Sequence, residues 1–130
     1  MNFNAVANTL PEKVMQIVES VDFYEEQNRQ ILGYFLFGML NGLAHETKAK
    51  PVQVQGVMLK ALISDLQYSP DQAAQFFQSI VNATKRENHP TAFAIIHRGM
   101  NSYFDFEAEQ YDKVKKDFHE IMVAISKSMK

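Results

Sequence analysis

The spacing of apolar residues predicts helices along most of the chain. In two clear segments apolar side chains recur every three or four residues, which is the period of one helix face. The first segment contains Val14, Ile17, Val18 and Val21, and the last contains Tyr111, Val114, Phe118, Ile121 and Ile125. Polar residues separate the apolar ones, so each segment is expected to be an amphipathic helix with one face in the core.

Residues 31–44 differ from these segments because they are apolar on nearly every face. The run is long and shows no alternation of apolar and polar positions, so a helix is favoured over a strand. A helix that is apolar all round must be surrounded by others. Gly38 and Gly42 lie on one side of it, and glycine costs about 1 kcal/mol against alanine in a helix. The pair indicates that the backbone of another helix comes close at this side. Packing within the chain is favoured over contact with a partner protein.

Several helix starts are marked by capping residues and prolines. Thr9, followed three residues later by Glu12, predicts a capping box at the start of the first amphipathic helix. The sequence Ser-Pro-Asp-Gln at residues 69–72 is a second start signal of the same kind. Pro51 and Pro90 each suit the first turn of a helix, where the missing N–H would have no partner.

The helix that begins at Pro90 carries buried positions as far as Met100, Tyr103 and Phe104. Gly99 interrupts it, so a bend or an end is expected between residues 99 and 102. Residues 22–30 and 45–50 are expected to be polar connectors.

Together these elements predict an all-α fold, an irregular bundle of about six helices around the central hydrophobic helix. The chain has 130 residues, of which 46% are hydrophobic, and this is enough to fill one core. We therefore expect residues 1–130 to form a single domain, with residues 1–8 as a short N-terminal arm.

Composition excludes several classes of protein. There are no cysteines, which rules out disulfides and thiol catalysis and suits a reducing compartment, so the cytoplasm is the expected location. The net charge of -2 offers no basic face for nucleic acid. No apolar run reaches the roughly 20 residues of a membrane span, and residues 1–8 do not resemble a secretion signal.

Side chains for catalysis, metal or cofactor binding do not occur in recognisable patterns. The four histidines form no HExxH, HxxxH or ExxH pair, so no metal site is predicted. No nucleophile elbow, phosphate-binding loop or dinucleotide motif is present either, and we predict no catalytic residue and no cofactor. His97 is expected to be half-buried and hydrogen-bonded within a helix contact. Arg98 is expected to pair with an acidic side chain such as Asp65 or Asp105, and the functional alternative is a carboxylate or phosphate of a partner.

Acidic residues are plentiful, and most such runs are solvated helix faces. Their functional interpretation is a docking surface that attracts a basic partner. The candidate residues for this surface are Glu25, Glu26, Asp105, Glu107, Glu109 and Asp112.

Three segments carry a resemblance to a known family. Residues 37–42, 68–73 and above all 88–100 resemble a small all-helical immunity family of bacterial polymorphic-toxin systems, immunity protein 48. The similarity covers residues 31–103, and its most specific element is His-x-Thr followed by Ile-x-His-Arg-Gly. In this chain the residues on that motif are His89, Thr91, His97, Arg98 and Gly99. The chain departs from the pattern in the proline after His89 and in residues 101–103.

The resemblance implies a protein that is not an enzyme but binds and neutralises a cognate toxin, protecting the producing cell or its siblings. A helical surface would occlude the active site of the toxin, and acidic side chains would imitate the phosphates that a nuclease binds. Two other hypotheses stay open. One is a homodimeric regulatory or scaffold protein that uses its last helix and the Gly38/Gly42 face, and the other is an enzyme that uses His97 with a distant carboxylate.

Overall fold

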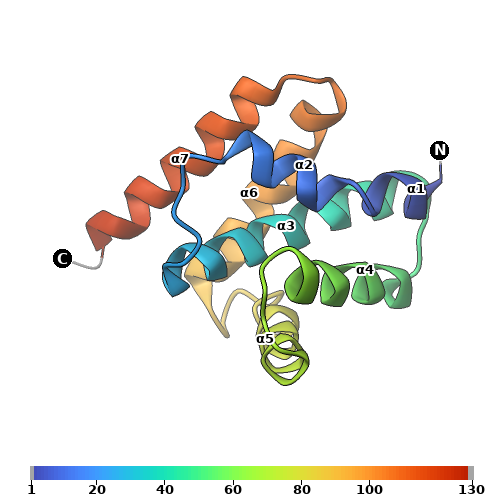
Figure 1. The fold of residues 1–130 in the computed structure, drawn as a ribbon, viewed down its shortest axis with the longest axis horizontal. Helices are drawn as coiled ribbons and strands as arrows, with labels where there is room; N and C mark the ends of the chain where they lie inside the picture. The colour runs from blue at the N-terminus through green and yellow to red at the C-terminus, as the bar shows by residue number, and fades with distance from the viewer. Residues whose placement is uncertain (1, 129–130) are drawn as a thin grey trace.

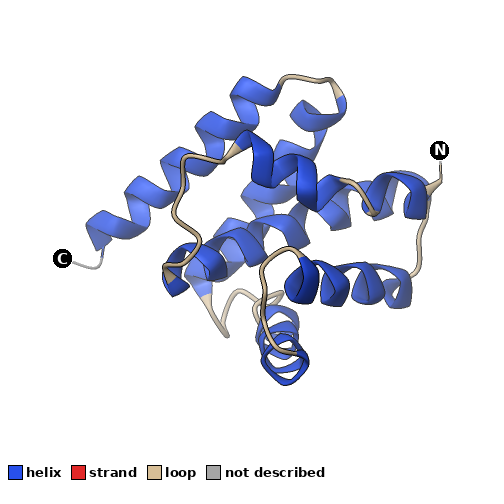
Figure 2. Cartoon of the chain, viewed as in Figure 1, coloured by secondary structure: helices blue, strands red, loops and turns tan. Residues whose placement is uncertain are grey.

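The computed structural model describes residues 2–128, and these form seven helices and no strand (Figures 1 and 2). The all-helical prediction is confirmed. The helices are α1 (Phe3–Ala7), α2 (Leu10–Ile17), α3 (Glu26–Thr47), α4 (Pro51–Ser64), α5 (Pro70–Asn82), α6 (Pro90–Glu107) and α7 (Tyr111–Ser128). The structure has one helix more than the sequence predicts, because the expected N-terminal arm contains α1.

Helix α3 is the centre of the bundle, as predicted, and the other helices surround it (Figure 1). Its middle turns are buried on all sides, which agrees with the apolar run in the sequence. The helix is longer than residues 31–44, because a polar turn extends it at each end. It stops at Lys48, whose left-handed conformation, with φ of 58°, breaks the helical hydrogen bonding.

The N-terminal residues are part of the core. Phe3 and Ala7 of α1 are buried against it, because the two residues lie on one face of a short helix. The predicted capping of α2 by Thr9 is wrong. The chain enters α2 directly from the preceding turn, and the Thr9 hydroxyl donates to the Val6 carbonyl at 3.1 Å instead.

The start of α5 is formed as the sequence predicts. The Ser69 hydroxyl accepts a hydrogen bond from the Gln72 backbone N–H at 3.2 Å, and the Gln72 side chain accepts one from the Ser69 N–H at 3.1 Å. These reciprocal bonds satisfy two backbone donors that the helix leaves without partners. Pro70 occupies the first turn, as Pro51 and Pro90 do in α4 and α6.

Helices α3 and α6 cross at glycines, and Figure 1 shows the two ribbons passing over one another. A Cβ atom on Gly38 would lie 1.9 Å from the Ile96 carbonyl oxygen, and one on Gly99 would lie 2.2 Å from the Phe35 carbonyl oxygen. Gly99 therefore does not end or bend the helix as expected, and α6 runs unbroken to Glu107. The prediction that the Gly38/Gly42 face packs within the chain is confirmed, with Gly42 lying against Tyr103.

Helix α7 packs its predicted apolar face on the bundle. Val114, Phe118 and Ile121 are buried, and the Phe118 ring meets the Phe35 ring at 5.3 Å between centroids. Tyr111 and Phe104, which were also expected inside, are 39% and 56% exposed. Most of the two faces on which the homodimer hypothesis depends is thus covered by the chain itself.

Candidate functional site

Helix α6 and the residue that caps it carry all five motif residues, and the structure gives them different surroundings. His89 precedes the helix and caps it, because its Nδ1 accepts a hydrogen bond from the Ala92 backbone N–H at 3.1 Å. Its ring also lies 6.0 Å from the ring of Tyr34. Thr91 is exposed in the first turn of the helix. Histidine is not a common capping residue, so sequence rules did not reveal this role of His89.

Arg98 joins α6 to α7 through Asp117, and the predicted pairing with Asp65 or Asp105 is wrong. Its guanidinium donates to Asp117 Oδ1 at 3.2 Å. The other oxygen of Asp117 accepts a hydrogen bond of 2.7 Å from the hydroxyl of Ser102, which is completely buried. One carboxylate therefore holds two side chains of the neighbouring helix.

His97 is exposed, which corrects the expectation of a half-buried imidazole in a polar network. Its ring packs on the ring of Phe93, one helical turn earlier, with 4.2 Å between centroids. Both rings lie on the side of α6 that does not face the core. His97 thus belongs to the surface of the molecule, whereas its neighbour Gly99 belongs to the helix crossing.

An open groove of about 850 Å³ lies between α3 and α6 on this side, and we call it the α3–α6 groove. The groove has apolar side chains at its base and cationic or titratable ones around them. Its lining includes Phe37, Phe93, Met100, His45, Lys48 and His97. Sequence analysis did not identify it. The signal was present in the helical spacing of Phe93, His97 and Met100, which defines a second face of α6.

The six acidic candidates lie in two separate places. Glu25 and Glu26 are at the start of α3, whereas Asp105, Glu107, Glu109 and Asp112 surround the connection between α6 and α7, which we call the acidic turn. Figure 1 shows these two regions at different ends of the molecule. The structure thus brings four of the six together and leaves two apart.

Glu26 is held by its own chain. Its carboxylate accepts hydrogen bonds from the Tyr68 hydroxyl at 2.8 Å and from Arg29, whose guanidinium also stacks over the Tyr68 ring at 4.0 Å. Desolvation acts to raise the pKa of Glu26, but the hydrogen bonds from Arg29 and Tyr68 outweigh it and lower the pKa. Glu26 therefore ties α3 to the segment before α5, while Glu25 is exposed without a capping bond.

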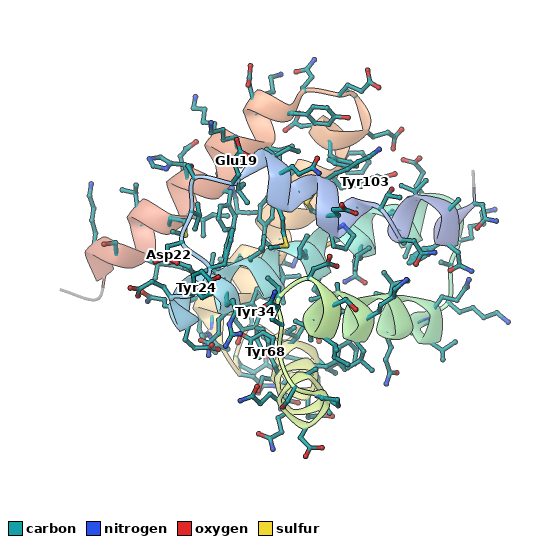
Figure 3. All side chains as sticks on the ribbon, in the orientation of Figure 1. Glu19, Asp22, Tyr24, Tyr34, Tyr68 and Tyr103 are labelled. Atoms are coloured by element: carbon teal, nitrogen blue, oxygen red, sulfur yellow. The ribbon has the colours of Figure 1, made fainter. Side chains whose placement is uncertain are left out.

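At the acidic turn, Glu107 meets Glu46 from the end of α3. The buried Tyr103 hydroxyl interacts with both carboxyl groups. Figure 3 shows that Tyr103 lies well away from Tyr68, the tyrosine that contacts Glu26. A hydrogen bond with Glu107 raises the pKa of Glu46 above its ordinary value, and desolvation acts in the same direction. Burial raises the pKa of Tyr103, and its bond to Glu107 adds to this. The two carboxylates repel each other when both are charged.

Glu107→Gln is therefore expected to stabilise the fold at pH 7. A carboxyl group with a raised pKa in the folded state contributes stability below its unfolded pKa, and this contribution is lost as pH rises through the folded pKa. Removing the repulsion should raise the urea midpoint at pH 7 and have less effect near pH 4, where Glu46 is protonated. Glu109→Gln, with the same charge change away from Glu46, is the control. An equal effect of both variants at pH 7 would contradict the pairing.

Within residues 2–128, the side chains bring together no group of three or more His, Asp or Glu residues that could hold a metal ion. Among the same residues, no helix combines the length and the hydropathy that crossing a membrane requires.

The described residues form a helical protein with an open groove between α3 and α6 and an acidic turn between α6 and α7. The model of the immunity protein 48 family matches residues 3–126, and the chain belongs to this family. It is thus an immunity protein and not an enzyme, and its family implies that it neutralises a cognate toxin. Comparisons with curated proteins and with solved structures found no match.

Proposed function

We propose that the protein binds its cognate toxin directly in the cytoplasm of the protected cell, and that the acidic turn covers the active site of the toxin. The observation that carries this proposal is the gathering of Asp105, Glu107, Glu109 and Asp112 at one turn. None of them forms an ion pair with another residue that the structure describes. No cation of the described residues therefore neutralises these carboxylates, and a basic partner can do so.

Electrostatic attraction of this kind acts mainly on the rate of association and on the choice of partner. Like a row of phosphates, closely spaced carboxylates complement the cationic site of an enzyme that cleaves or modifies nucleic acid. Family membership supplies the toxin as partner, and the charge supports a basic surface on it. The helices that form the turn pack on the core through Phe106 and Val114, so the surface is formed before the toxin arrives.

Co-expression with the toxin encoded by the adjacent gene tests the proposal. The wild-type protein is expected to restore growth, and the triple variant E107K/E109K/D112K is expected to lose protection. Its association rate constant at low salt should fall by about tenfold or more, because attraction becomes repulsion. The triple variant E19K/E87K/E120K changes the net charge equally at exposed residues elsewhere and should protect. Failure of the wild type to protect would overturn direct neutralisation, whereas protection by both variants would overturn the role of the acidic turn.

A further inference from the structure

We propose that the α3–α6 groove receives an apolar segment of the toxin that carries a carboxylate. The inference rests on the proposed function, since it assigns a second surface to the same complex. The acidic turn carries carboxylates, whereas the groove is lined by Lys48 and two histidines, so the two surfaces recognise different features of one partner.

The groove follows from how the two helices cross. Gly38 and Gly99 bring the backbones of α3 and α6 into contact, and helices that cross at an angle diverge away from that point. On the side of Phe93 and His97, the two helices leave an open space of about 850 Å³ between them. That volume lies in the range of about 300–1,000 Å³ typical of ligand sites, and it can hold several side chains of one segment.

Two of the large apolar side chains that line the groove are only partly covered. Phe93 and Met100 of α6 are half-buried, and they face Phe37 of α3 across the groove. Phe104, one turn beyond Met100, is 56% exposed and continues the same face of α6. Exposed aromatic and methionine side chains in a concave site are typical anchors of protein interfaces.

The charge of the groove selects the partner. Lys48, His45 and His97 line it, and no carboxylate of the described residues does. This contrasts with the whole chain, in which 15 acidic residues exceed 13 lysines and arginines. Glu46 follows His45 in α3, but it is engaged with Glu107. A carboxylate among apolar groups would therefore find hydrogen-bond donors and a positive charge at the edge of an apolar surface.

A toxin segment fits these features better than a second copy of this chain. The long apolar faces of this chain, on α3 and α7, are already packed in its own core. A toxin segment that enters as a helix would place side chains three and four positions apart into the groove, which is the usual pattern of helix recognition between two helices.

Charge reversal in the groove gives the first test. Binding of a catalytically inactive form of the adjacent toxin is measured by isothermal titration calorimetry. Lys48→Glu and His97→Glu should each weaken binding by about tenfold or more, the effect of losing one important contact. Lys48→Arg should retain binding, and Lys60→Glu, on the exposed face of α4, should change the dissociation constant by less than about twofold. Thermal unfolding of each variant shows whether the fold is kept.

Carbodiimide crosslinking of the wild-type complex gives a second test that needs no variant. The reagent joins an amine to a carboxylate in contact with it, so mass spectrometry should find Lys48 Nζ linked to an aspartate or glutamate of the toxin. The inference is overturned if the toxin binds but no such link forms and both charge reversals bind normally, an outcome that leaves the proposed function intact. Light scattering that shows dimers broken by His97→Glu, with toxin binding unchanged, would also overturn it. If the wild-type protein binds no toxin at all, the proposed function itself fails.

Discussion

Gly38→Ala is expected to lower the free energy of unfolding by about 3 kcal/mol, the upper end of the usual cost of overpacking. The added Cβ would lie 1.9 Å from the Ile96 carbonyl oxygen and 2.9 Å from its carbonyl carbon. Both are backbone atoms of a helix, so they cannot rotate away as a side chain can. The two central helices must separate, and the contacts around Phe35 loosen with them. Such a loss is a large part of the roughly 5–15 kcal/mol that stabilises an ordinary domain.

Two other glycines provide graded controls for urea unfolding measurements. A Cβ on Gly42 would meet Tyr103 side-chain atoms at 3.0–3.1 Å, which need to shift by only a few tenths of an ångström, so Gly42→Ala should cost less. Gly56, on α4, has no atom within 4 Å of an added Cβ. Gly56→Ala should therefore stabilise the protein by up to about 1 kcal/mol, the difference in helix propensity. Equal stability of Gly38→Ala and wild type would show that α3 and α6 do not meet as described.

The same glycines show how far the sequence could predict the fold. The spacing of Gly38 and Gly42 correctly indicated a close helix approach on one side of the central helix. The other half of the contact was missed, because Gly99 was interpreted as a place where a helix bends or ends. Local rules include only the propensity cost of glycine. The compensating benefit is the close packing of Gly99 against the backbone of Phe35, which lies far away in the sequence.

The candidate site was less predictable, because its contacts depend on how the helices are connected. Arg98 had several carboxylates to choose from, and the chain reversal between α6 and α7 selects Asp117, 19 residues later. That reversal places Glu109 at a positive φ of 60°, a position that glycine usually marks. Asp117 was not among the carboxylates that the sequence analysis named as partners for Arg98. Its position just before Phe118, at the edge of the apolar stripe, was the available signal.

The clustering of the acidic residues was missed for a similar reason. Glu25 and Glu107 looked alike in the sequence, as members of exposed acidic runs. Only the fold separates them, because it places Glu107 beside Glu46 at the end of α3 and leaves Glu25 at the other end of that helix. The α3–α6 groove likewise forms only where the two helices pack together. The pattern of apolar residues on either helix alone does not predict a concave surface.

Asp117→Ala is expected to cost about 2 kcal/mol, and the loss should come mainly from Ser102. The side chains of Arg98 and Asp117 are 42% and 26% exposed, so water screens their ion pair. Exposed pairs of this kind contribute about 0–1 kcal/mol. Ser102 is fully buried, and without Asp117 its hydroxyl loses an acceptor at 2.7 Å that water cannot easily replace. An unsatisfied buried hydroxyl costs about 1–3 kcal/mol.

A double-mutant cycle measured by urea unfolding separates the two contributions. Arg98→Ala alone should cost about 0.5 kcal/mol, in keeping with a screened pair. The double variant S102A/D117A should be more stable than the sum of its single variants predicts, by at least about 0.5 kcal/mol, because no orphaned hydroxyl remains. A strictly additive cycle would mean that Ser102 finds another acceptor, such as the Arg98 carbonyl one turn earlier in α6. In that case the contact between α6 and α7 would depend on the Arg98–Asp117 pair and on the apolar packing of Val114 and Phe118.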